Sequence, residues 1–231
     1  MDKAKVAEIL CCKTNWNNLE LPEQNIYFKD DDTVIYCADC KDILPLLPNV
    51  DLVLTDPPYN VGLDYSDGDN KVDYQEWCKH WFSLLSEPIF ITPGMVNIAM
   101  WYSIKTPLWC ISWIKNNQCS PSRLGGFNAW EPILVYGKPN KRIGQDILIN
   151  SIITSQQGVG DHPCPKDAES WSMLIDKISN KNDIVLDTFL GSGTTAYCAK
   201  KLGRKCIGIE ISEKYCQIAV ERLRQSVMRL E

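Results

Sequence analysis

The stretch Val50–Gly62, VDLVLTDPPYNVG, places an acid, two prolines and a tyrosine directly after an apolar run. The carboxylate of Asp56 can accept hydrogen bonds from an amine. Pro57 and Pro58 fix the backbone dihedral φ and carry no N–H group, so the carbonyl groups between them are held in place. Tyr59 adds an aromatic ring to the same turn. An ordinary turn needs no such combination, so the rest of the sequence has to supply the partner that explains it.

Four acids follow apolar runs that are typical of buried strands: Asp39, Asp56, Asp187 and Glu210. In an open parallel sheet the carboxyl ends of the strands border one crevice, where ligands bind. A single acid in this position is more often a helix cap than a ligand-binding group. Four of them beside a glycine loop instead predict one shared site, whose ligand offers hydroxyls, amines or positive charge, because the carboxylates would otherwise repel each other.

The glycine loop Gly191–Ala196 fits the pattern G-x-G-x-x-A, and Glu210 follows about 20 residues later, as in dinucleotide-binding folds. An NAD- or FAD-binding protein is therefore one interpretation. Asp187 just before the loop would repel a pyrophosphate, whereas it suits a ligand with a positive amine. S-adenosylmethionine, an adenosine with an amino-acid tail and no phosphate, satisfies this requirement. Glu210 would then hold the ribose hydroxyls, and Asp39 would accept from the adenine amino group.

Two of these segments resemble the motifs of a known family. TDPPY at Thr55–Tyr59 and DTFLGSGTT at Asp187–Thr195 resemble the catalytic and cofactor motifs of the DNA amino-methyltransferases, which modify exocyclic amines of adenine or cytosine. The catalytic motif precedes the cofactor loop, as in the β class of that family. HPCPK at His162–Lys166 is similar to the family's H-P-x-x-K motif, and WEPILVYGK at 130–138 to its late hairpin. The resemblance extends from about Tyr36 to Leu223.

The resemblance implies methyl transfer from S-adenosylmethionine to a base that is flipped out of double-stranded DNA. Asp56 and the Pro57 carbonyl would accept the two N–H groups of the amine, and Tyr59 would stack on the base. Together, Asp56, Pro57, Pro58 and Tyr59 form the expected catalytic group. Adenine is favoured because family members with Asp at the head of the motif mostly modify adenine, and cytosine is the alternative. The residues expected at the cofactor are Asp39, Cys40, Asp56, His162, Lys166, Asp187, Phe189, Gly191, Ser192, Gly193, Thr194, Thr195 and Glu210.

The net charge of −5 does not favour a nucleic-acid partner, but charge can be unevenly distributed. Between positions 115 and 142 the sequence contains one acid, Glu131, and five basic residues: Lys115, Arg123, Lys138, Lys141 and Arg142. We expect these basic residues to contact DNA phosphates. The alternative is that they form an ordinary solvated surface. The segment 139–160 is short for a target-recognition insertion. A homodimer or a partner subunit could supply the missing contacts. Trp130 can be either core or pocket wall.

Composition sets the general class of the protein. Of the 231 residues 45% are apolar and 23% are charged, which is the ordinary globular balance. The sequence has no apolar run long enough for a membrane span and no signal-peptide pattern, so we expect a cytoplasmic protein of a prokaryotic or virus-infected cell. Eleven cysteines without a secretory signal predict free thiols. Cys37 and Cys40 have C-x-x-C spacing but no second pair of ligands, so no metal is expected.

The alternation of predicted strands and helices indicates an α/β fold. With the resemblance, we expect a single Rossmann-like methyltransferase domain with a mostly parallel sheet and a late antiparallel hairpin. Residues 1–32 are expected to be an extension with a short helix near Lys3–Cys11, and residues 33–231 the domain. Apolar patterns predict strands at 33–39, 50–56, 95–102, 109–114, 129–138, 184–187 and 205–211. Helices are expected after 40 and at 74–87, 171–179, 194–202 and 213–223, and a loop at 138–161.

Overall fold

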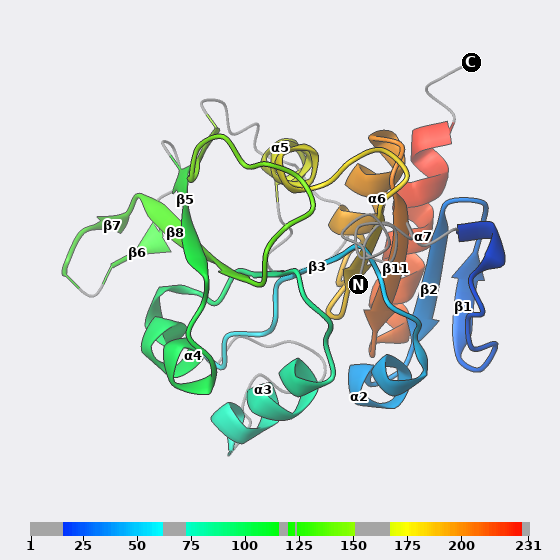
Figure 1. The fold of residues 1–231 in the computed structure, drawn as a ribbon, viewed down its shortest axis with the longest axis horizontal. Helices are drawn as coiled ribbons and strands as arrows, with labels where there is room; N and C mark the ends of the chain where they lie inside the picture. Colours follow the sequence, from blue (N-terminus) through cyan, green and yellow to red (C-terminus); the bar gives the residue numbers. More distant parts are fainter. Residues whose placement is uncertain (1–15, 62–72, 116–119, 123, 151–166, 228–231) are drawn as a thin grey trace, which may run out of the picture.

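Nine strands form one mixed sheet in the described part of the computed structural model, which comprises residues 16–61, 73–115, 120–122, 124–150 and 167–227 (Figure 1). The strand order is β1-β2-β11-β10-β3-β4-β8-β5-β9. These strands are β1 Ile26–Lys29, β2 Thr33–Cys37, β3 Leu52–Thr55, β4 Ile89–Ile91, β5 Trp109–Lys115, β8 Trp130–Tyr136, β9 Ile147–Asn150, β10 Ile184–Asp187 and β11 Lys205–Glu210. A separate ribbon pairs β6 Ser120–Pro121 with β7 Phe127–Asn128.

Helices connect the strands. They are α2 Cys40–Ile43, α3 Tyr74–Ser83, α4 Ile98–Ile104, α5 Ala168–Ile178, α6 Thr194–Lys201 and α7 Glu213–Val227, with 3-10 turns η1 Trp16–Asn18, η2 Leu44–Leu46 and η3 Met95–Asn97. No helix in the described ranges is long and apolar enough to cross a membrane.

Five neighbouring strands, β2, β11, β10, β3 and β4, run parallel to each other. Their residues are almost all buried, and a continuous apolar run is typical of a strand that is covered on both faces. β8 is antiparallel to β4, and β5 is antiparallel to β8, so β5 runs in the same direction as the parallel block. The carboxyl end of the sheet is therefore where β2, β11, β10, β3, β4 and β5 all end.

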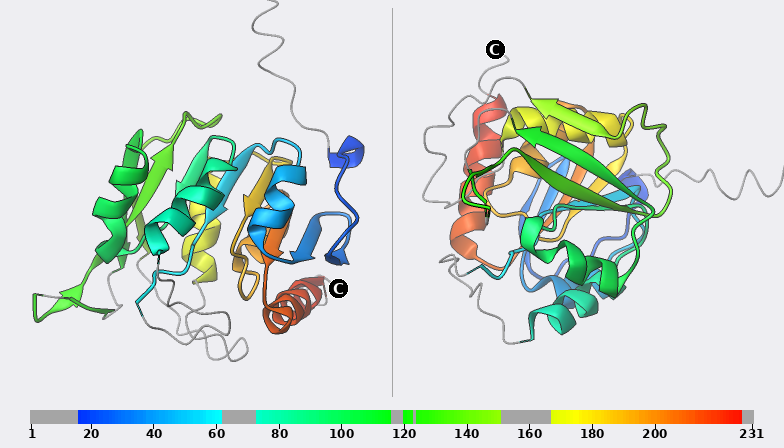
Figure 2. Two further views of the ribbon diagram at one scale, coloured as in Figure 1. Left: turned by 90° about the horizontal axis from the view of Figure 1, so that it is seen from below. Right: turned by 90° about the vertical axis from the view of Figure 1, so that its left-hand side faces the viewer.

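Alternate residues of each strand enter two separate cores. Ile35, Leu52 and Leu54 pack in the core under α5, α6 and α7, whereas Val34 and Val53 pack in the core under α2, α3 and α4. Successive side chains of a strand point to opposite faces, which explains this division. Figure 2 shows the helices on both faces of the sheet. This three-layer arrangement agrees with the predicted α/β fold.

Four predictions of local structure are wrong. Residues 95–102 form the turn η3 and the helix α4 instead of a strand, and buried Trp101 packs on Trp81 at a ring distance of 5.6 Å. β4 was missed because its three residues are too few to show a period. β1 and β9 lie in segments predicted as an irregular extension and a loop, yet they pair with β2 and β5. The predicted helix at Lys3–Cys11 lies outside the described residues.

Candidate active site

The four predicted acids lie at the carboxyl end of four neighbouring strands. Asp187 and Glu210 are the last residues of β10 and β11, Asp56 follows β3 directly, and Asp39 lies two residues after β2. Because β2, β11, β10 and β3 are consecutive in the sheet, these acids occupy one continuous row. Among the described residues no group of three or more His, Cys, Asp or Glu side chains could hold a metal ion. A row of carboxylates offers hydrogen-bond acceptors to a ligand with donor groups.

Two hydroxyl groups bind the same oxygen of Asp56. Tyr59 donates its O–H to Oδ1 at 2.5 Å, and the hydroxyl of Thr92 donates to that oxygen as well. Thr92 is fully buried, whereas Asp56 is half-buried. Hydrogen bonds to an ionised carboxylate are among the strongest in proteins and fix its orientation. The carboxylate of Asp56 is therefore held by contacts from its own turn and from the neighbouring strand.

The backbone of the D-P-P-Y turn is held from two further elements. Tyr74, the first residue of α3, donates to the carbonyl of Pro58 at 2.6 Å, and the side-chain amide of Asn97 donates to the carbonyl of Tyr59 at 2.9 Å. The ring of Tyr59 lies against Gly94, where φ is +69° and an added Cβ would be 3.0 Å from the ring. Each of these contacts limits the movement of the turn.

Sequence reasoning missed Thr92, Tyr74 and Asn97. Thr92 has a signal in the sequence, because it follows the short apolar run Ile89–Ile91 as Asp56 follows β3. The parallel register pairs Thr55 with Ile91, which places the next residues of the two strands side by side. Tyr74 and Asn97 have no comparable signal, since their roles depend on how the helices pack.

Asp187 is buried and binds other parts of the protein through both oxygens. Thr55 donates to Oδ1 at 2.9 Å and the Phe189 N–H to the same oxygen at 3.1 Å, while the Thr195 hydroxyl donates to Oδ2 at 2.5 Å. The indole N–H of Trp171 donates to Thr195 at 2.8 Å. One carboxylate thereby links β3, the glycine loop, α6 and α5. Burial raises the pKa of Asp187 to about 6, although these hydrogen bonds oppose the shift.

The glycine loop is closed by Glu210. Its Oε2 accepts from the N–H of Gly191 at 2.8 Å, and its Oε1 from the N–H of Ser212 at 2.9 Å. Gly193 has φ of +80°, and a Cβ there would lie 2.6 Å from the Cβ of Ala219 in α7. A side chain would therefore clash at this position, which explains the second glycine of the motif.

The other predicted cofactor residues lie in different surroundings. Ser192, Thr194 and Thr195 are buried, and Arg222 donates to the Thr194 hydroxyl at 2.7 Å, so these residues shape the underside of the loop. Phe189 packs on Trp81 at a ring distance of 5.0 Å. Most side chains of the glycine loop therefore contact the protein and hold the backbone of the loop in place.

Asp39 and Cys40 begin α2. Asp39 caps this helix by accepting from the N–H of Lys41 at 3.0 Å, and the ammonium group of Lys41 lies 3.1 Å from its carboxylate. The side chain of Cys40 is buried in the core, and burial together with Asp39 raises the pKa of its thiol to about 12. The thiol is therefore protonated and unreactive at neutral pH. His162 and Lys166 lie outside the described residues.

The residues predicted to contact phosphates lie in different surroundings. Lys115 is 9% exposed, and its ammonium group lies 2.5 Å from Glu131. Lys141 donates to the carbonyls of Asp176 and Ser179 at the end of α5. β8 runs opposite to the parallel strands, so Lys138, Lys141 and Arg142, which follow it, lie beyond the amino end of the sheet, away from Asp56. Arg123 lies outside the described residues.

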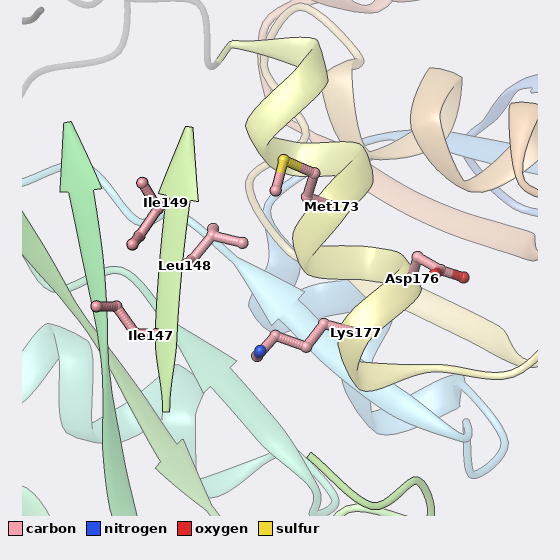
Figure 3. A pocket seen from close by; sticks show the side chains of 6 residues that line it. All are labelled: Ile147, Leu148, Ile149, Met173, Asp176 and Lys177. Atoms are coloured by element: carbon pink, nitrogen blue, oxygen red, sulfur yellow. The ribbon is translucent and has the colours of Figure 1, made fainter. Parts of the chain in front are cut away.

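A cavity of ≈ 380 Å³ lies between β9 and α5, away from the row of acids (Figure 3). Its lining is mostly apolar and contains none of the predicted catalytic or cofactor residues: Ile147, Leu148, Ile149, Met173, Asp176 and Lys177. The candidate active site is thus defined by the acids at the carboxyl end of the sheet and not by this cavity.

Comparisons with known proteins find similarity to DNA methyltransferases. A family model described as DNA methylase, of the N6/N4 methyltransferase type, matches residues 130–221. The type II methyltransferase M.HpaI of Haemophilus parainfluenzae is 29% identical over 230 residues, covering 80% of this chain and 73% of that protein.

Two solved structures are also similar. The structure of an M1.HpyAVI–SAM complex is 28% identical, with a TM-score of 0.62, and the alignment covers 83% of this chain and 98% of that one. The PvuII DNA methyltransferase, described as cytosine-N4-specific, is 17% identical, with a TM-score of 0.66 over 87% of this chain and 89% of that one. The latter similarity concerns the fold alone. The fold of this chain is that of these DNA methyltransferases.

The raised pKa of Asp187 gives a testable pH dependence of stability. Its folded-state pKa of about 6 exceeds the ordinary 3.8, so the folded protein holds this proton more tightly than the unfolded chain does. Stability should therefore fall as pH rises through this window, by roughly 3 kcal/mol from this group. Asp187→Asn keeps an oxygen acceptor for Thr55 and Phe189 but has no charge to bury. Urea unfolding from pH 4 to 7 should show the variant gaining stability relative to wild type with increasing pH. A difference that does not change with pH would contradict this.

Proposed function

We propose that the chain is a DNA methyltransferase of the N6/N4 type, like the proteins to which it is similar, and that it transfers a methyl group from S-adenosylmethionine to the 6-amino group of adenine in DNA. The observation that carries this proposal is the position of Asp56. Its carboxylate is fixed by Tyr59 and Thr92 at the end of β3, next to β10 and the glycine loop. An acceptor for the amine is therefore held beside the loop that we assign to the cofactor.

The residues of the row fit S-adenosylmethionine. The positions next to the glycine loop carry the carboxylates of Asp39, Asp187 and Glu210, which suit a cationic ligand with hydroxyls and no phosphate. We assign Glu210 to the ribose hydroxyls and Asp39 to the adenine amino group. Asp187 is buried beneath the loop, so it acts through its negative charge and through the loop backbone that it holds. When bound, the cofactor supplies an electrophilic methyl group. The same carboxylates disfavour the pyrophosphate of NAD.

Asp56 and Pro57 activate the amine of the base. The lone pair of an exocyclic amine is delocalised into the ring, which makes the nitrogen a poor nucleophile. Hydrogen bonds from its two N–H groups to the Asp56 carboxylate and the Pro57 carbonyl favour a pyramidal nitrogen and localise the lone pair. Both acceptors are held before the substrate arrives, so little reorganisation is needed during the reaction. The nitrogen must lose one proton when it gains the methyl group, and Asp56 is the base that we assign to take it.

Tyr59 has two roles in this proposal. Its hydroxyl orients Asp56, and its ring, supported from one side by Gly94, offers a flat surface for the flipped base. Stacking on an aromatic ring offsets part of the few kcal/mol that are lost when a base leaves the duplex. A purine gains more from stacking than a pyrimidine, because it is larger. This supports adenine as the target base, with the 4-amino group of cytosine as the second candidate.

The position of Asp56 also sets where the DNA binds. The flipped base must reach the carboxyl end of the sheet, so we propose that the duplex lies across that end. Lys138, Lys141 and Arg142 lie at the amino end and are not part of this surface. Because the segment 139–160 contains β9 and leaves little chain for target recognition, we further propose that a second copy or a partner subunit contributes contacts to the DNA.

Nucleoside analysis tests the reaction and the base together. Mixed-sequence duplex DNA incubated with the chain and labelled S-adenosylmethionine, then digested, should release labelled N6-methyladenine. Asp56→Ala should abolish this label yet bind the cofactor, measured by calorimetry, with nearly wild-type affinity, because Asp56 acts on the base. Label found only in 4-methylcytosine would refute adenine and leave the mechanism intact. An Asp56→Ala protein with an unchanged rate would refute the mechanism.

Thr92, which directly follows β4, should affect catalysis through its hydrogen bond to Asp56. Thr92→Val keeps the shape of the side chain but removes the hydroxyl that donates to Asp56. A hydrogen bond to a charged group contributes about 1.5–3 kcal/mol, so kcat should fall roughly 10- to 100-fold. The cofactor Kd should stay unchanged, and Thr92→Ser, which keeps the hydroxyl, should restore most of the rate. A variant in which Kd rises while kcat is preserved would show that Thr92 serves the cofactor and not Asp56.

A further inference from the structure

The β6–β7 hairpin has a defined tip. The N–H of Ser122 donates to the carbonyl of Gly126 at 2.8 Å, and the N–H of Gly125 to the carbonyl of Ser122 at 3.2 Å. The N–H of Leu124 donates to the Ser122 hydroxyl at 3.0 Å, and Gly125 adopts a φ of +81°. Gly125 adopts this conformation without the steric cost of a side chain, which makes the tight reversal possible. Leu124 is therefore presented from a hydrogen-bonded turn.

Among the described residues of the tip, the large side chains are apolar and project into solvent. Leu124 is 97% exposed and Phe127 70% exposed, and Trp130 at the base of the hairpin is 36% exposed. Single exposed apolar residues are common on protein surfaces. Two highly exposed ones on a narrow projection indicate a contact surface. Figures 1 and 2 show this hairpin extending beyond the ends of β5 and β8, away from the body of the protein.

The base of the hairpin is firmly held. Lys115 in β5 and Glu131 in β8 form a buried ion pair at 2.5 Å across the two strands. The Lys115 ammonium also lies 4.1 Å from the centre of the Trp113 ring, and the backbone N–H of Lys115 donates to the carbonyl of Ala129 at 2.8 Å. These contacts fix the direction in which the hairpin leaves the sheet. The projecting side chains therefore have a defined position relative to β5.

The hairpin lies at the same end of the sheet as Asp56. β5 runs in the direction of the parallel strands and ends at Lys115, where the hairpin begins. Three strand spacings separate β3 from β5, which corresponds to roughly 14 Å. A duplex whose major groove alone is about 12 Å wide can span this distance while its flipped base lies at β3. The sequence from Asn116 to Trp130 also contains no Asp or Glu that would repel phosphates.

We propose that Leu124 and Phe127 form an apolar wedge that enters the DNA duplex beside the flipped base. This inference rests on the proposed function. Extruding a base unstacks its neighbours and leaves a gap in the duplex, and apolar side chains inserted between base steps are a known way to stabilise such distorted DNA. Leu124 and Phe127 act through their shape and their apolar surface, so their effect on duplex DNA does not depend on charge. Single-stranded DNA, whose bases are already accessible, does not need it.

The test compares duplex and single-stranded substrates. The variant Leu124→Ser/Phe127→Ser should lose about tenfold or more in kcat/KM on mixed-sequence duplex DNA, because the extruded state is no longer supported. On single-stranded DNA of the same sequence its rate should change less than about twofold, since no extrusion is needed. The matched control is Leu46→Ser/Leu108→Ser. It removes two exposed apolar side chains that precede β3 and β5 at the amino end of the sheet, and it should leave both rates unchanged.

Each outcome separates the wedge from its alternatives. If the wild-type chain methylates neither substrate, the proposed function fails. If it methylates both, but the hairpin variant retains its duplex rate, the wedge is refuted while the function stands. Equal losses on both substrates would also refute the wedge. A hairpin variant that changes oligomeric mass in light scattering, without a duplex-specific loss, would show that the hairpin binds another protein chain instead of DNA.

Discussion

The buried carboxylate of Asp187 is the interaction on which the site depends. It binds Thr55 on one side and Thr195 on the other, and Thr195 in turn accepts from Trp171. Thr55 directly precedes Asp56 in the chain. The strand that carries the amine acceptor and the helix that follows the glycine loop are therefore attached to one charged group. Because burying a charge without partners is very costly, its hydrogen bonds are difficult to rearrange.

This arrangement explains how a small sheet can position two substrates. The parallel strands bring four acids into one row, but carboxylates alone do not fix a geometry. Asp187 and Glu210 also bind the protein itself, where they accept from the N–H groups of Phe189 and Gly191. Asp56 is oriented by Thr92 and Tyr59. The orientation of each acid thus depends on a neighbouring strand or turn.

The sequence predicted the parts of the fold that depend on long apolar runs. β2, β3, β10 and β11 are identified from apolar runs that end in an acid or are followed closely by one. β4 has only three residues, too few to show a period, and β9 lies in a segment whose Gly, Asn and Gln residues are typical of a loop. The segment containing α4 is apolar enough to suit either a strand or a helix. Its helical state follows from the packing of Trp101 against Trp81 and Phe82, which no local pattern records.

The site was predictable only in part, for a similar reason. Asp56, Asp187 and Glu210 were found because each stands at the end of a strand that can be recognised in the sequence. Thr92 was missed because its strand was missed. The basic residues after β8 lie at the opposite end of the sheet from Asp56, because that strand runs antiparallel to β4. The distance of a residue from a motif in the sequence therefore does not show at which end of the sheet the residue lies.

We infer that Asp187 couples the strand of the amine acceptor to the cofactor loop. A double-mutant cycle with Thr55→Val and Thr195→Val, measured by the unfolding free energy and by the Kd for S-adenosylmethionine, can detect this coupling. Since both hydroxyls bind one carboxylate, we expect an interaction energy of about 0.5–3 kcal/mol between the two substitutions. Effects that add within about 0.3–0.5 kcal/mol, as for independent sites, would show that Asp187 does not couple the two elements.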